Sequence, residues 1–203
     1  MNFSKFFAGF FLGSLIVLAF QPFNYWFVTF LIPGLLYQLI KTEGIKNTFF
    51  ISYFFGFGLW AFGIFWIENS ITVYGGASPI LGSFLTLLLA AFLSLFQAIS
   101  FTAFKLVSSQ RKTHEIFLLF PAAWVLSEWL REFLFTGFPW LMPSMIFASN
   151  VYLIQIFAFV GSFSTNIIVL TISILPFIFF SNFKGKNTIF LILLIPIVIV
   201  VFF

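Results

Sequence analysis

Three charged side chains lie close together in a chain that has very few charges. Glu128, Arg131 and Glu132 follow the spacing i, i+3 and i+4, which places them on one face of a helix. Ionisable groups in membrane-type sequence are costly and usually functional. A guanidinium can bind a phosphate through two parallel hydrogen bonds, so Arg131 could hold a phospholipid at the mouth of a lipid path. The competing interpretation is an interfacial ion pair that only anchors a helix end.

A second candidate is the short loop segment that follows these charges. It consists of Gly137, Phe138, Pro139 and Trp140. It could dip toward a membrane and shape an entrance for acyl chains, or it could be a rigid turn whose Trp belongs to an interfacial aromatic belt. Trp66 and Glu68 are expected to end the third helix, either as a lipid-contacting wall or as belt and cap residues.

Composition indicates a membrane protein. Of 203 residues, 62% are hydrophobic and 7% are charged, against roughly 25% charged in an ordinary soluble domain. The mean hydropathy is +1.17. The net charge of +4 comes from basic residues scattered in short loops, without a basic stripe that could follow a phosphate backbone. Nucleic acid is therefore not expected as a partner.

Several kinds of chemistry are excluded by absent residue types. The chain has no Cys, no Asp and one His. This excludes a Cys nucleophile, a disulfide framework, a Cys-based zinc site and a Ser-His-Asp triad. No phosphate-binding Gly-Lys-Ser/Thr loop occurs. We expect no catalytic residue, metal or cofactor within these residues.

Seven apolar runs predict an all-α fold, a polytopic transmembrane bundle of about seven helices that forms one domain over 1–203. Several runs are shorter than the roughly 20 residues that cross a bilayer, and flanking aromatic residues are expected to extend them. The first run lacks a signal-peptidase site and is expected to be retained. The runs are at about 6–22, 25–40, 48–67, 79–106, 115–130, 151–180 and 188–203.

Basic residues predict the orientation. If seven helices alternate, eight of the nine Lys and Arg residues fall on one side and only Arg131 on the other, which predicts a cytoplasmic N-terminus. The eight are Lys5, Lys41, Lys46, Lys105, Arg111, Lys112, Lys184 and Lys186. The candidate residues Trp66, Glu68, Glu128, Arg131 and Trp140 then belong to the opposite, outer face.

These outer-face residues carry a family resemblance. Glu-Trp-Leu-Arg at 128–131, followed by Thr-Gly-Phe-Pro-Trp at 136–140, resembles the signature of the bacterial apolipoprotein N-acyltransferases. The second block is specific. Weaker matches are Phe-Trp-Ile at 65–67 with Ser70 and Gly75-Gly76, Pro-Ala-Ala-Trp at 121–124, Gln155 with Gly161, and Pro22. The resemblance extends over essentially the whole chain.

The resemblance implies a multi-pass protein of the bacterial inner (plasma) membrane. Family members have eight transmembrane helices and a periplasmic nitrilase-like domain between the seventh and eighth. They transfer an acyl chain from a phospholipid donor to the N-terminal diacylglyceryl-cysteine of a lipoprotein, through a thioester on a Cys supported by Glu and Lys. This chain has no Cys, so none of these catalytic roles is assigned here. We expect a truncated membrane half that provides lipid access and anchoring and is inactive by itself.

Two other functions compete with this interpretation. A non-catalytic membrane scaffold, such as a remnant or split copy, would have the same composition. A small transporter would carry ionisable groups within its helices at mid-membrane. The sequence places the charges at helix ends, which disfavours the transporter.

Overall fold

The structure, a computed structural model, describes residues 3–108, 113–134, 137–138 and 140–179. Within these ranges all regular secondary structure is helical, which confirms the predicted all-α class. The α-helices are α1 (Phe3–Ile16), α2 (Val28–Ile40), α3 (Ile45–Gly63), α4 (Ile67–Asn69), α5 (Pro79–Ser108), α6 (Thr113–Phe133) and α7 (Ile156–Phe179). Short 3₁₀ segments are η1 (Val17–Ala19), η3 (Pro143–Ser149) and η4 (Leu153–Gln155), and η2 (Ser70–Tyr74) is a π-helical turn.

Six of the seven predicted apolar runs each overlap mainly one α-helix, and the seventh, 188–203, lies outside the described residues. By length and hydropathy, however, fewer than seven of the described helices qualify as membrane spans. Pro79–Ser108 and Leu153–Ile178 qualify, and α3 with the segment Ile67–Tyr74 makes a third if that bent pair is one span. The helices α1 and α2 have only 14 and 13 residues. The polar ends of α6 lower its hydropathy.

Helices α1 and α3 pack with their backbones almost in contact. Gly9 and Gly13 form a Gly-x-x-x-Gly pair on α1, which is typical of close helix packing in membranes. A Cβ atom on Gly9 would lie 2.7 Å from the carbonyl oxygen of Ile51, and one on Gly13 would lie 2.9 Å from the backbone nitrogen of Leu59. The larger residues Phe3, Phe7, Phe11 and Leu15 occupy the exposed face of α1.

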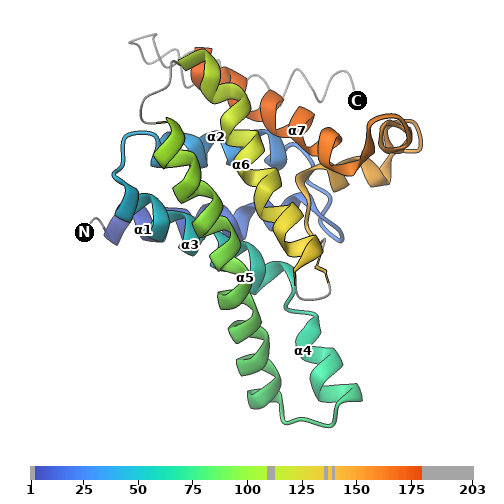
Figure 1. Ribbon diagram of the computed structural model, residues 1–203. Helices are drawn as coiled ribbons and strands as arrows, with labels where there is room; N and C mark the ends of the chain where they lie inside the picture. The colour runs from blue at the N-terminus through green and yellow to red at the C-terminus, as the bar shows by residue number, and fades with distance from the viewer. Residues whose placement is uncertain (1–2, 109–112, 135–136, 139, 180–203) are drawn as a thin grey trace.

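Helix α3 lies at the centre of the packing, against α1 on one side and α5 on the other, while α6 packs between α5 and α7 and α2 packs against α7 (Figure 1). The core joins aromatic rings from three helices. Trp124 of α6 packs edge-on against Phe55 of α3 and Phe101 of α5, with ring centroids 5.4 and 5.7 Å apart. All three side chains are almost completely buried. These contacts fix the position of α6, which carries the charged candidates.

The 30-residue α5 extends beyond the rest of the bundle and is accompanied there by α4 and η2 (Figure 1). At 1.5 Å per residue its length is about 45 Å. We call α4, η2 and the projecting end of α5 the arm. Its two sides lie close together because Gly82 lets α5 approach the Glu68 backbone and the Thr72 side chain. Ile80 and Tyr74 on this arm are strongly exposed. Glu68 therefore lies in α4 on the arm and not at the end of the third helix, which ends at Gly63. Trp66 lies between α3 and α4 and directly precedes α4.

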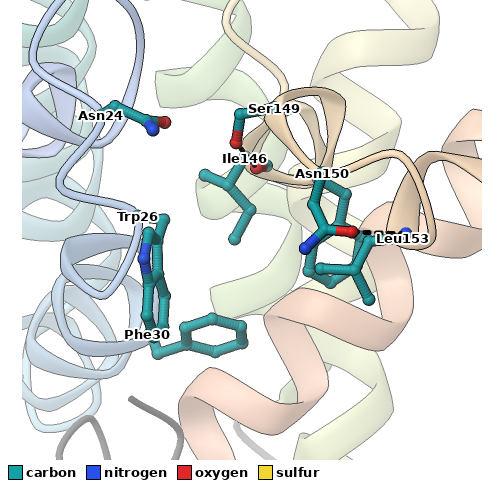
Figure 2. Close-up of a pocket in the computed structure, with 8 residues that line it drawn as sticks. Asn24, Trp26, Phe30, Ile146, Ser149, Asn150 and Leu153 are labelled. Carbon is teal, nitrogen blue, oxygen red and sulfur yellow. Dashed lines mark hydrogen bonds between the residues drawn. The ribbon is translucent and has the colours of Figure 1, made fainter. Parts of the chain in front are cut away.

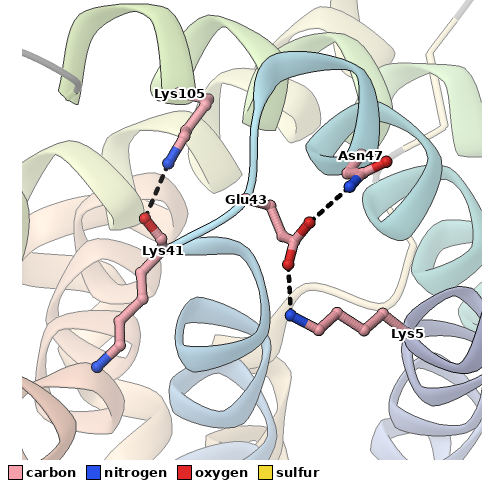
Figure 3. Close-up of polar contacts among 5 residues, drawn as sticks. All are labelled: Lys5, Lys41, Glu43, Asn47 and Lys105. Carbon is pink, nitrogen blue, oxygen red and sulfur yellow. Dashed lines mark hydrogen bonds and ion pairs between the residues drawn. The ribbon is translucent and has the colours of Figure 1, made fainter. Parts of the chain in front are cut away.

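One end of the bundle is held by basic residues, as Figure 3 shows. Lys5 of α1 forms an ion pair with Glu43, which also accepts a hydrogen bond of 2.7 Å from Asn47. Lys105 of α5 donates to the carbonyl oxygen of Lys41 at 2.8 Å. The hydrogen bonds from Lys5 and Asn47 hold the pKa of Glu43 below its ordinary value. The basic residues of three described segments thus meet at one place, which we call the basic end.

The opposite end of the bundle gathers three loops that are far apart in sequence. A single cavity there is lined by Gln21 and Asn24 after η1, by Trp66 after α3, and by Trp140 and Ser149 after α6. We call this the tryptophan end. The basic residues and the two Trp residues lie at opposite ends because successive helices run in opposite directions along the chain.

Candidate functional site

Arg131 lies inside the tryptophan end and is 2% exposed. Its Nη1 donates hydrogen bonds to the carbonyl oxygens of Phe138 and Trp140, at 2.9 and 3.4 Å. Its guanidinium carbon lies 4.5 Å from the centre of the Trp60 ring, in cation–π geometry. The Nε atom is buried and has no hydrogen-bond partner among the described residues. Arg131 therefore fastens the loop after α6.

Glu128 is also fully buried and is held by two other helical side chains. Trp124 Nε1 donates to its carboxylate at 2.9 Å, and Asn166 of α7 donates to the other carboxylate oxygen. The side-chain oxygen of Asn166 in turn accepts a hydrogen bond of 2.9 Å from the backbone of Ser144. This chain of contacts ties α6, α7 and the start of η3 together. Buried polar networks of this kind fix one arrangement when their members are satisfied.

The competing interpretation of these charges, an interfacial ion pair, is therefore wrong for the described residues. Within the described ranges the ion pair formed is that of Lys5 with Glu43, and Arg131 uses backbone carbonyls instead. Glu132 points away and is exposed. The spacing placed all three residues on one helix face, but Glu128 and Arg131 turn inward because Asn166 and the loop carbonyls are there to receive them.

The cavity at the tryptophan end has a volume of about 380 Å³. Trp66 and Trp140 form part of its wall, with ring centroids 5.4 Å apart, and each is about half exposed. Leu141 contributes as well and has a left-handed backbone, with φ of 58°. The structure thus brings together two of the residues singled out in the sequence from positions 74 residues apart.

A second cavity, of about 160 Å³, lies between α5 and α6 on the other side of the loop. Leu89, Phe92, Leu93 and Phe96 of α5 supply an apolar wall, and Arg131 and Phe138 line the same space. Phe138 packs on Trp60 and Trp140, with centroids 5.8 and 6.1 Å apart. The short loop after α6 therefore separates two cavities, with a buried cation beside the apolar one.

Gly137 makes the turn into this loop. Its φ of 85° is a conformation that L side chains rarely adopt, and its backbone nitrogen bonds the carbonyl oxygen of Leu134 at 3.3 Å. Pro139, another sequence candidate, lies outside the described residues. No group of three metal-ligating side chains occurs among the residues described here.

Sequence reasoning missed the partners that define the site. Asn166 was not singled out, although it links Glu128 to Ser144. Trp60 was not singled out, although its ring lies over Arg131 and its Nε1 bonds Gln97 at 3.2 Å. A polar amide within an apolar helix was the available signal for Gln97 and Asn166.

Two structural features bear on the transporter alternative. Arg131 lies in the last turn of α6, at a helix end as predicted, but it and Glu128 are both buried. Helix α7 is moreover interrupted at Gly161, where φ is 78°. Relationship to known proteins, not charge placement, decides between these functions.

The family model of the apolipoprotein N-acyltransferase N-terminal domain matches residues 12–175. The apolipoprotein N-acyltransferase of Photobacterium profundum is 34% identical over 129 residues, which are 64% of this chain and 25% of that relative. The one of Pasteurella multocida is 38% identical over 137 residues, 67% and 25% of the two chains. The one of Coxiella burnetii is 38% identical over 130 residues, 64% and 27%. The matched region spans about a quarter of the length of these relatives, and the chain belongs to the apolipoprotein N-acyltransferase family.

Proposed function

We propose that this chain is the membrane part of an apolipoprotein N-acyltransferase and supplies lipid access and membrane anchoring. In this proposal a phospholipid is the acyl donor, a diacylated lipoprotein is the acceptor, and the thiol that carries the acyl group comes from outside this sequence. Family membership supports the proposal. The chain itself has no Cys.

The observation that carries the proposal is a buried cation beside an apolar cavity. Arg131 lines the cavity between α5 and α6, and its Nε is unpartnered within the part of the chain that the structure describes. Phospholipids combine these two properties, an anionic headgroup and an apolar chain. We assign the phosphate or ester oxygens to Arg131 and part of one acyl chain to the α5 wall. Glu128 holds α6 against α7 through Asn166 and so positions the helix that carries Arg131.

The loop residues have different roles in the same proposal. Phe138 closes the cavity toward Trp60, and Gly137 sets the course of the loop. Trp66 and Trp140 contact lipid in the larger cavity. Glu68 contacts lipid from the arm, where it lies close to Gly82 of α5. Aromatic rings with a polar edge suit the headgroup region of a bilayer.

We propose that the long described helices each cross the inner membrane, with the basic end in the cytoplasm. The gathering of Lys5, Lys41 and Lys105 supports this orientation. Reporter fusions after Gly44 and after Trp140 should report cytoplasm and periplasm, respectively. The reverse pattern would place the candidate site on the wrong face and defeat the proposal.

The chain by itself should not form triacylated lipoprotein. Transfer requires a nucleophile that breaks the donor ester and then releases the acyl group to the acceptor amine, and no thiol is present to do so. The test is to incubate the purified 203-residue chain with phospholipid and a diacylated lipopeptide, beside the complete Photobacterium profundum enzyme as a positive control. Product formed by the chain itself would show that the chemistry lies within these residues.

A further inference from the structure

A separate cavity of about 180 Å³ lies beside the tryptophan end, between the loop after η1 and the η3–η4 segment (Figure 2). Its apolar floor is formed by Trp26 and Phe30, whose rings meet edge-on with centroids 6.2 Å apart. Asn24, Ser149 and Asn150 line its upper part. Asn24 and Ser149 also line the larger cavity with Trp66 and Trp140, so the two spaces are adjacent.

The polar lining is neutral and has unused hydrogen-bonding capacity. The side-chain oxygen of Asn150 accepts hydrogen bonds from the backbones of Tyr152 and Leu153, at 2.9 and 3.2 Å. No hydrogen bond of its amide nitrogen is found among the described residues, and Figure 2 shows this atom directed into the cavity. The Asn24 side chain points toward the same space from the opposite loop, held there by a backbone with φ of 56°. Ser149 donates to the carbonyl oxygen of Ile146 at 3.1 Å.

This lining selects among ligand classes. None of the described residues that line the cavity carries a charge, so it offers no opposite charge to a phosphate or an ionised group. A primary amide presents a donor and an acceptor in one plane, which matches a peptide group. The volume is close to that of an engineered apolar cavity of about 150 Å³ that holds benzene, so the floor takes about one side chain.

We propose that this cavity is a subsite for the polypeptide part of the acceptor. One uncharged side chain of the lipoprotein is buried against Trp26 and Phe30, and the amides of Asn24 and Asn150 bind the neighbouring peptide groups. The inference rests on the proposed function because it takes the acceptor to be a lipoprotein. It adds a polypeptide site distinct from Arg131 and from the cavity between α5 and α6.

Two substitutions test this subsite without disturbing Arg131. Asn24→Gly removes the amide while keeping the left-handed backbone accessible, so the loop should stay folded. Leu153→Trp fills the cavity from its side. The probe is a fluorescent diacylated lipopeptide with an uncharged peptide, bound to the full chain in lipid nanodiscs. Diacylglycerol lacking the peptide is the matched ligand, and Leu81→Trp on the exposed arm is the matched variant.

Asn24→Gly should weaken lipopeptide binding about threefold to tenfold, the effect of one neutral hydrogen bond. Leu153→Trp should weaken it about tenfold to a hundredfold, because a side chain is no longer buried. Diacylglycerol binding should not change in either variant, and Leu81→Trp should bind both ligands like the wild type.

Unchanged lipopeptide binding in Leu153→Trp would overturn the subsite, and so would an equal loss of lipopeptide and diacylglycerol binding. A third contradicting outcome is displacement of the bound lipopeptide by glucose but not by the unlipidated peptide, which would assign the cavity to a sugar. Phospholipid binding is measured on the same samples. If it persists and depends on Arg131 while Leu153→Trp has no effect, the subsite fails alone. If the wild-type chain binds no phospholipid, the proposed function fails.

Discussion

Gly13→Val is expected to leave little or no folded protein. A Cβ at Gly13 would collide with the Phe55 carbonyl group, with its carbon 2.8 Å away, and would lie 2.9 Å from the backbone nitrogen of Leu59. These are backbone atoms of α3, so no side chain can rotate to make room. Overpacking a core costs about 1–3 kcal/mol when neighbours can adjust. Here α1 must separate from α3, and we expect the loss to exceed that range.

The measurement is the yield of monodisperse protein in detergent, together with its thermal unfolding. Gly44→Ala is the matched control, because no atom lies within 4 Å of the added Cβ and the Gly44 φ is −76°. The control should behave like the wild type. A Gly13→Val protein that elutes and unfolds like the wild type would show that α1 and α3 do not pack as described.

Arg131→Met should release the loop after α6. The substitution removes the charge-assisted hydrogen bonds to Phe138 and Trp140 and the cation–π contact with Trp60. Hydrogen bonds to charged groups contribute about 1.5–3 kcal/mol each, and a desolvated cation–π contact about 2 kcal/mol. Removing a buried charge offsets part of this sum, so we expect a destabilisation of about 3 kcal/mol.

Thermal unfolding measures the destabilisation of Arg131→Met, and limited proteolysis near Trp140 measures the release of the loop. Arg131→Lys keeps the charge but loses the planar fork, and should lie between wild type and Arg131→Met. Glu132→Gln changes an exposed neighbour on the same helix and should have no effect. If Arg131→Met resists unfolding and proteolysis as well as Glu132→Gln does, Arg131 does not hold the loop.

The sequence predicted the features that depend on local composition. The bounds predicted for the 79–106 run agree with those of α5 to within two residues, because no charged cluster or internal Pro interrupts this apolar run. The gathering of Lys5, Lys41 and Lys105 at one end follows from helix alternation alone. The Glu128 and Arg131 spacing likewise predicted a shared helix face. Local pattern was enough for each of these.

Features that depend on distant partners were not predictable in this way. The inward position of Glu128 requires Asn166, 38 residues later, and that of Arg131 requires the Phe138 and Trp140 carbonyls. The third helix ends at Gly63, and Leu141, 78 residues later, packs against that glycine. The resulting bend of 54° carries Glu68 onto the arm. Spacing alone cannot locate such partners.

Photolabelling by a phospholipid with a diazirine in its acyl chain tests most directly whether lipid enters the site beside Arg131. The wild-type chain in nanodiscs should carry adducts on Phe92, Phe96 or Phe138, and Leu89→Trp, which fills that cavity, should abolish them. Arg131→Gln should reduce them at equal amounts of folded protein. Labelling spread over the exposed Phe3, Phe7 and Phe11, and unchanged in both variants, would contradict the account.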